Sequence, residues 1–66
     1  MRANRVYEIR VSRAMIEVLA IDTGEIALFW DVRPGQTRRL AKALRADLSQ
    51  LDDQTFLDKW TVYDQS

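Results

Sequence analysis

The side chains that most often carry catalysis or bind metals are missing from this chain. Its 66 residues include no His and no Cys, which excludes the usual catalytic triads, thiol nucleophiles and zinc, haem or iron–sulfur sites. No motif places a base near Ser12, Ser49 or Ser66, and Gly24 and Gly35 are isolated turn residues rather than a phosphate-binding loop. We therefore predict that the protein is not an enzyme and uses no metal and no cofactor.

Positive charge recurs on one predicted helix. Arg38, Lys42 and Arg45 are spaced i, i+4 and i+7, with Arg39 to one side. Like charges at this spacing repel each other, so they do not serve helix stability. We call these four residues the basic ridge and predict that they bind an acidic protein surface or phosphates. An ordinary solvated helix face would show the same pattern.

Other features favour a protein partner over a nucleic acid. The net charge of the chain is zero, and no aromatic residues are interleaved with the cations of the basic ridge. Trp30 and Trp60 would suit a binding site, because Trp is enriched at interface hot spots. In a chain this small, however, both are predicted to be core residues.

The basic ridge belongs to the longest helical pattern in the chain, residues 37–51. Four leucines fall on one narrow stripe opposite the ridge, flanked by Thr37 and Ala41: Leu40, Leu44, Leu48 and Leu51. Thr37, which follows a Pro-Gly pair, is predicted to be the N-cap of this helix.

A second, short helix is expected after Asp52, a good N-cap residue. Leu51 before that cap and Phe56 after it have the spacing of a hydrophobic staple. Phe56, Leu57 and Trp60 share one face and are predicted to pack on the edge of the core. Residues 61–63 could form a short terminal strand or a tail.

Three strands are expected before the helices, at residues 5–12, 15–21 and 26–32. The first alternates apolar and polar residues with period two, and the other two are rich in Ile, Val and Leu. Residues 22–25, Asp-Thr-Gly-Glu, read as a tight hairpin turn. The chain is thus predicted to be a single α+β domain over residues 1–66. Its order is βββαα: a three-stranded antiparallel meander, then a long amphipathic helix and a short C-terminal helix, in two layers.

The register of the second hairpin decides which side chains share a face of the sheet. A two-residue loop at Thr23-Gly24 would place Leu19 opposite Leu28 and Val18 opposite Phe29. One face, predicted to meet the long helix, would then carry Leu19, Ile21, Ile26, Leu28 and Trp30. The opposite face, predicted to be a dimer interface, would carry Ile16, Val18, Ala20, Ala27 and Phe29. A different protein or the short helix could also cover that second face.

The small size of the chain favours association with a partner chain. A domain of this length buries a small core, and without disulfide or metal the remaining route to added stability is association. No signal peptide and no membrane span is expected, and the lack of Cys agrees with a cytoplasmic location. We predict a non-catalytic protein–protein interaction module: a small homodimeric accessory, regulatory or inhibitor protein of a bacterium or phage. The alternative is a small nucleic-acid-binding regulator that uses the basic ridge.

Overall fold

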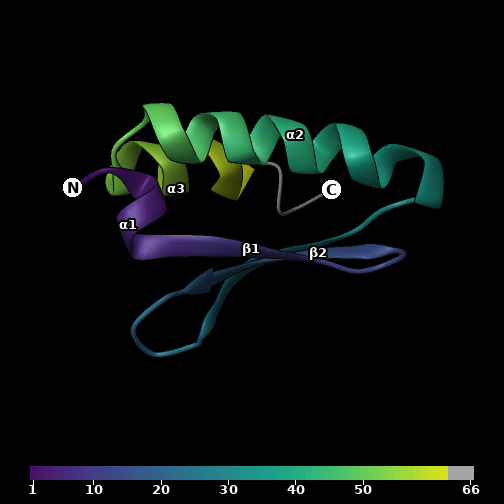
Figure 1. Cartoon of the computed structure of the whole chain (residues 1–66), viewed down its shortest axis with the longest axis horizontal. Coiled ribbons are helices and arrows are strands. Elements are labelled where there is room, and N and C mark those ends of the chain that lie inside the picture. The colour runs from purple at the N-terminus through teal and green to yellow at the C-terminus, as the bar shows by residue number, and fades with distance from the viewer. Residues whose placement is uncertain (63–66) are drawn as a thin grey trace.

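The computed structural model describes residues 1–62. Three antiparallel strands form one sheet in the order β1-β2-β3, and the helices lie on one face of it (Figure 1). The predicted α+β arrangement is confirmed, with an added helical turn at the start. The elements are α1 (Ala3–Val6), β1 (Tyr7–Val11), β2 (Met15–Ala20), β3 (Ile26–Asp31), α2 (Pro34–Gln50) and α3 (Asp53–Thr61).

The turn between β2 and β3 is longer than predicted. The backbone N–H of Ala20 donates to the carbonyl of Glu25 (2.8 Å), and the N–H of Gly24 donates to the carbonyl of Ala20 (2.8 Å). A two-residue loop would require a positive φ at Thr23, which is unfavourable for a β-branched residue. In the described part of the chain only Gly24 has a positive φ, of 76°.

Next to this longer turn, Leu19 pairs with Ile26, two residues away from its predicted partner. An irregularity between Val18 and Leu19 then leaves the rest of the ladder one residue away from the predicted register, with Val18 opposite Leu28 and Ile16 opposite Trp30. Because side chains alternate between faces, a shift of one residue moves a whole strand to the other side. Leu28 and Trp30 face the helices as predicted, whereas the assignment of Leu19 and Ile26 to that face was wrong.

The residues predicted to form a dimer interface therefore do not share a face. Ile16 and Val18 are 0% exposed and belong to the core beneath the helices. Ala20, which pairs with Tyr7, is half-buried, and only Ala27 and Phe29 are exposed. A second copy could not reach all five without opening the core.

Helix α2 buries the predicted stripe. Thr37, Ala41, Leu44 and Leu48 are buried, and Leu40 and Leu51 are half-buried. The helix begins earlier than predicted, at Pro34, whose fixed φ and missing N–H suit a first helical position. Arg33, not Thr37, is therefore the N-cap residue.

Thr37 has another role inside the first turn of α2. Its hydroxyl donates to the carbonyl of Arg13 (3.2 Å) in the β1–β2 loop and lies 3.3 Å from the carbonyl of Arg33. The hydroxyl thus links the start of α2 to the sheet.

Helix α3 follows the prediction closely. Asp52 is its N-cap and accepts a hydrogen bond from the Thr55 N–H (3.0 Å). Phe56 and Trp60 are buried, and Leu57 is half-buried. Phe56 stacks on Tyr7 of β1 with ring centroids 6.0 Å apart. Thr61 ends α3, so it is not in a strand, and Tyr63 lies outside the described residues.

Helix α1 was not predicted, because residues 5–12 read as one strand. Ala3 of α1 is fully buried, and its N–H donates to the carbonyl of Leu51 (2.9 Å). The Arg2 guanidinium donates to the carbonyl of Ser49 (3.0 Å) at the end of α2. The N-terminal segment therefore holds the connection between α2 and α3.

Candidate functional site

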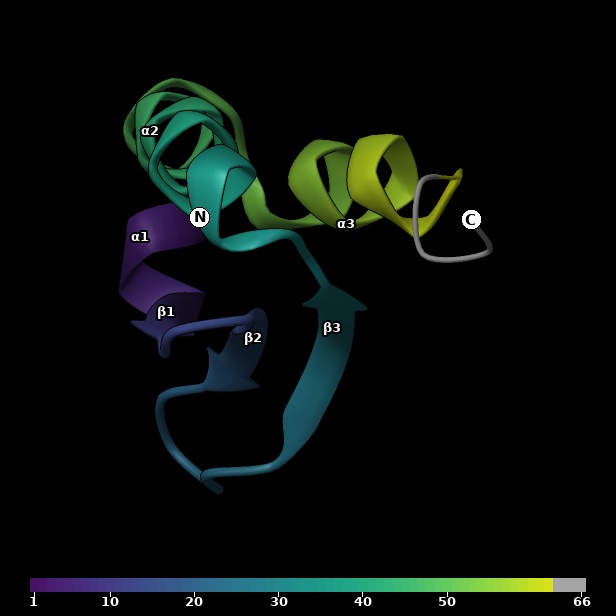
Figure 2. The same cartoon turned by 90° about the vertical axis from the view of Figure 1, so that its right-hand side faces the viewer.

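The face of the sheet turned away from the helices is the first candidate surface. In Figure 2, α1, α2 and α3 all lie above the sheet, and no other described element lies below it. The register places eight side chains on this side, which we call the open face: Glu8, Arg10, Met15, Glu17, Leu19, Ile26, Phe29 and Asp31.

An apolar strip crosses the open face along β2 and β3. Ile26 is 53% exposed and Phe29 is 50% exposed, although both are large apolar side chains. Leu19 is 3% exposed but does not belong to the core cluster beneath the helices. It lies between Glu8 and Ile26 in the register. The strip thus has a packed centre and two exposed flanks, as a surface for a partner needs.

The charges around this strip are mainly negative. Glu8, Glu17 and Asp31 contribute three carboxylates, and Arg10 contributes one guanidinium opposite Glu17. Glu17 is half-buried near the middle of the face, beside Phe29. Any partner that covers it must supply a cation or a hydrogen-bond donor, because an unpaired buried carboxylate is costly.

The basic ridge lies on the other side of the molecule. Arg38, Arg39, Lys42 and Arg45 are all exposed, and they point away from the sheet because the buried stripe of α2 points toward it. Within residues 1–62 none of the four side chains forms an ion pair or a hydrogen bond. The structure therefore leaves the ridge available to a ligand but does not bring it near the open face.

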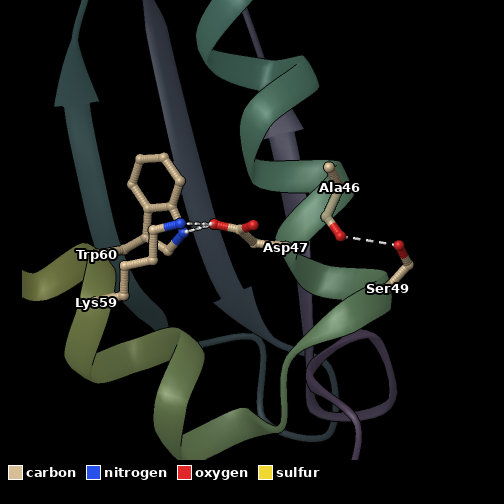
Figure 3. A network of polar contacts seen from close by, with 5 residues as sticks. All are labelled: Ala46, Asp47, Ser49, Lys59 and Trp60. Carbon is tan, nitrogen blue, oxygen red and sulfur yellow. Dashed lines mark hydrogen bonds and ion pairs between the residues drawn. The ribbon is translucent and has the colours of Figure 1, made fainter.

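A polar cluster between α2 and α3 was not predicted from the sequence. Oδ2 of Asp47 accepts a hydrogen bond from Trp60 Nε1 (3.0 Å) and forms an ion pair with Lys59 Nζ (2.7 Å), as Figure 3 shows. The Lys59 ammonium also lies 5.5 Å from the Trp60 ring centre. Asp47 is thirteen residues from Trp60, so no local pattern links them. These contacts hold α3 against α2, and we assign the cluster a structural role.

Both tryptophans are core residues, as predicted. Trp30 and Trp60 are buried and meet edge to face with ring centroids 5.9 Å apart. Trp30 Nε1 is buried and has no hydrogen-bond acceptor among residues 1–62. Their rings join β3 to α3.

One carboxyl group has a shifted pKa. Hydrogen bonds from Thr55, its side chain first and its backbone N–H second, lower the pKa of Asp52 below the ordinary value of 3.8. Asp52 is the N-cap of α3, so this shift reflects helix capping. In the described residues no three acidic side chains come together in a way that could hold a metal ion.

No helix within residues 1–62 is long and apolar enough to cross a bilayer. Comparisons of the chain with protein-family models, with curated proteins and with solved structures find no match.

Proposed function

We propose that this protein is a non-catalytic protein–protein interaction module: a small homodimeric accessory, regulatory or inhibitor protein of a bacterium or phage. The proposal places it in the cytoplasm, which the absence of Cys favours. The observation that carries the proposal is the open face, where Ile26 and Phe29 stay half exposed beside the packed Leu19. Exposed apolar residues rimmed by charges are typical of protein-binding surfaces.

The charges of the open face indicate the kind of protein it would bind. Three carboxylates and one guanidinium favour a partner segment with apolar anchors and basic flanks. Ile26 and Phe29 would contact the apolar side chains of this segment, and Glu17 and Asp31 would form ion pairs with its basic side chains.

A display library of random peptides tests this proposal without a known partner. Peptides selected on the wild type should combine apolar and basic residues. Phe29→Asp should weaken the binding of these peptides by about tenfold or more, because substitution of an interface hot spot costs more than about 1–2 kcal/mol of binding free energy. Gln54→Asp, at an exposed position of α3 outside both candidate surfaces, is the matched control and should leave binding unchanged. Selected peptides that bind Phe29→Asp as tightly as the wild type would rule out the open face.

A nucleic-acid-binding regulator is the second candidate, favoured by the four exposed and unpaired cations of the basic ridge. It predicts binding to random duplex DNA that falls steeply with salt. Replacing Arg38, Lys42 and Arg45 with Gln should then reduce the salt dependence. The melting temperature should stay the same or rise slightly, because like-charge repulsion is removed. Absence of salt-dependent DNA binding at low ionic strength would exclude this candidate.

A further inference from the structure

We propose that a second copy of this chain pairs with the outer edge of β1, joining two three-stranded sheets into one six-stranded antiparallel sheet about a two-fold axis. This inference rests on the homodimer of the proposed function and states where the second copy binds. It uses Glu8 and Arg10 at one side of the open face, and it leaves the apolar strip along β2 and β3 and the basic ridge of each copy available to other partners.

The backbone of β1 is prepared for such pairing. The N–H of Ser12 donates to the carbonyl of Met15 (2.9 Å), and the N–H of Ile21 donates to the carbonyl of Val6 (2.9 Å). Bonding alternates along an antiparallel ladder, so Glu8 and Arg10 also bond toward β2. The backbone groups of the odd-numbered residues of β1 therefore point away from the sheet.

Among these outward-pointing backbone groups, one already has a hydrogen-bond partner within the chain and the others do not. The N–H of Tyr7 is taken by the carbonyl of Ala3. The N–H groups of Ile9 and Val11 and the carbonyls of Tyr7, Ile9 and Val11 remain available, and no described strand pairs with them. Figure 2 shows β1 at one edge of the sheet, with α1 and α2 above it rather than beside it.

The sequence of β1, Tyr-Glu-Ile-Arg-Val, is complementary to itself when two copies run antiparallel. If Ile9 lies opposite Ile9 of the second copy, Tyr7 lies opposite Val11 and Glu8 lies opposite Arg10. Four of the five free groups of each copy then form four backbone hydrogen bonds across the axis, and the Val11 carbonyl is left over because the Tyr7 N–H opposite it already bonds to Ala3. Glu8 and Arg10 meet at non-hydrogen-bonded positions, where side chains approach most closely.

Charge selects this register over its neighbours. Sliding one strand by two residues in either direction keeps the hydrogen-bonding pattern but places the two-fold axis at Glu8 or at Arg10. Glu8 would then face Glu8 of the second copy, or Arg10 would face Arg10. Like charges directly opposite each other are destabilising. Only the register centred on Ile9 gives two opposite-charge pairs.

Apolar burial favours the same arrangement. On the helix side of β1, Tyr7 and Ile9 are half-buried and Val11 is 39% exposed. The second copy would cover all three, with Tyr7 of one chain against Val11 of the other.

The other edge of the sheet is less suited to a second copy. β3 carries the register irregularity opposite Leu19 and an exposed Asp31, features that protect edge strands from pairing. Helix α3 also extends above and beyond this edge in Figure 2. By contrast, β1 contains no Pro and no Gly, and its pairing with β2 is regular throughout.

Charge reversal gives a direct test by sedimentation equilibrium. Glu8→Arg and Arg10→Glu each change both cross-axis pairs to like charges, so each variant alone should dimerise roughly ten- to a hundredfold more weakly than the wild type. An equimolar mixture of the two variants should form a heterodimer, because every pair is again of opposite charge. Glu25→Arg, an equivalent reversal in the β2–β3 turn, should dimerise like the wild type.

A second variant probes the backbone. Val11→Pro removes an outward N–H without touching the β1–β2 ladder, so it should also weaken the dimer while circular dichroism still reports a folded chain. A wild type that is monomeric at millimolar concentration, single reversals that dimerise like the wild type, or variants that fail to form the heterodimer would overturn the inference. If Phe29→Asp disrupts the dimer and the β1 variants do not, the second copy binds the open face instead. Peptide binding to the open face reports separately on the proposed function.

Discussion

The two faces of the sheet are both rich in apolar residues, yet only one forms the core. Ile16, Val18, Leu28 and Trp30 lie beneath the helices and are nearly inaccessible to solvent, whereas Ile26 and Phe29 on the open face are half exposed. Ile26 and Phe29 even belong to the same strand, β3, as Leu28 and Trp30. What separates them is the apolar stripe of α2 together with Phe56 and Trp60 of α3, which cover one side only. Apolar content alone therefore does not identify the core of a small two-layer domain.

Equivalent substitutions on the two faces should have very different effects. Val18→Asp buries an unpaired carboxylate, which costs several kcal/mol and rivals the total of about 5 kcal/mol expected for so small a domain. We expect this variant to be unfolded at 25 °C. Phe29→Asp removes a half-exposed ring at a cost of about 1 kcal/mol and should remain folded.

Urea denaturation followed by circular dichroism compares these two variants. A cooperative transition in Val18→Asp similar to that of the wild type would show that β2 can present its other side to the core. Complete unfolding of Phe29→Asp would show that the open face is part of the folding core.

The packing of α3 over the core face of the sheet should depend moderately on Asp47. Its side chain is 17% exposed and binds both Trp60 and Lys59 of α3. Asp47→Ala should lower the free energy of unfolding by about 1.5–3 kcal/mol, as for hydrogen bonds to a charged group. Lys59→Gln removes only the exposed ion pair and should cost at most about 1 kcal/mol. Equal losses in the two variants, measured by chemical denaturation, would contradict a dominant role for the Trp60 hydrogen bond.

The smallest effect is expected at the N-cap of α3 and depends on pH. The pKa of Asp52 is lower in the folded state, so its contribution to stability is complete above its unfolded pKa, near 3.8, and is lost as pH falls through the folded pKa. Asp52→Asn keeps a capping oxygen but cannot titrate. Compared with this variant, the wild type should lose stability below about pH 4. Identical acid unfolding curves would show that the cap does not depend on the charge of Asp52.

Local patterns were sufficient for most of the elements. The leucine stripe of α2 and the capping Asp52 followed by Phe56 are both set by residues within a few positions of each other. Helix period, cap chemistry and strand alternation are properties of short segments, so the α+β order and the buried faces of both helices could be predicted. The exposure of the basic ridge followed from the same periodicity.

Tertiary structure decided the rest. The register of β2 against β3 was set by the longer turn together with the irregularity between Val18 and Leu19, and the resulting one-residue shift placed Ile16 and Val18 in the core rather than on the open face. Arg2 meets Ser49 across 47 residues, and Asp47 meets Trp60 across thirteen. Such contacts depend on how complete elements pack, because no periodicity connects residues so far apart in the chain. The sequence determined which residues are apolar, and the register of the sheet and the packing of the helices determined which of them are buried and which stay exposed.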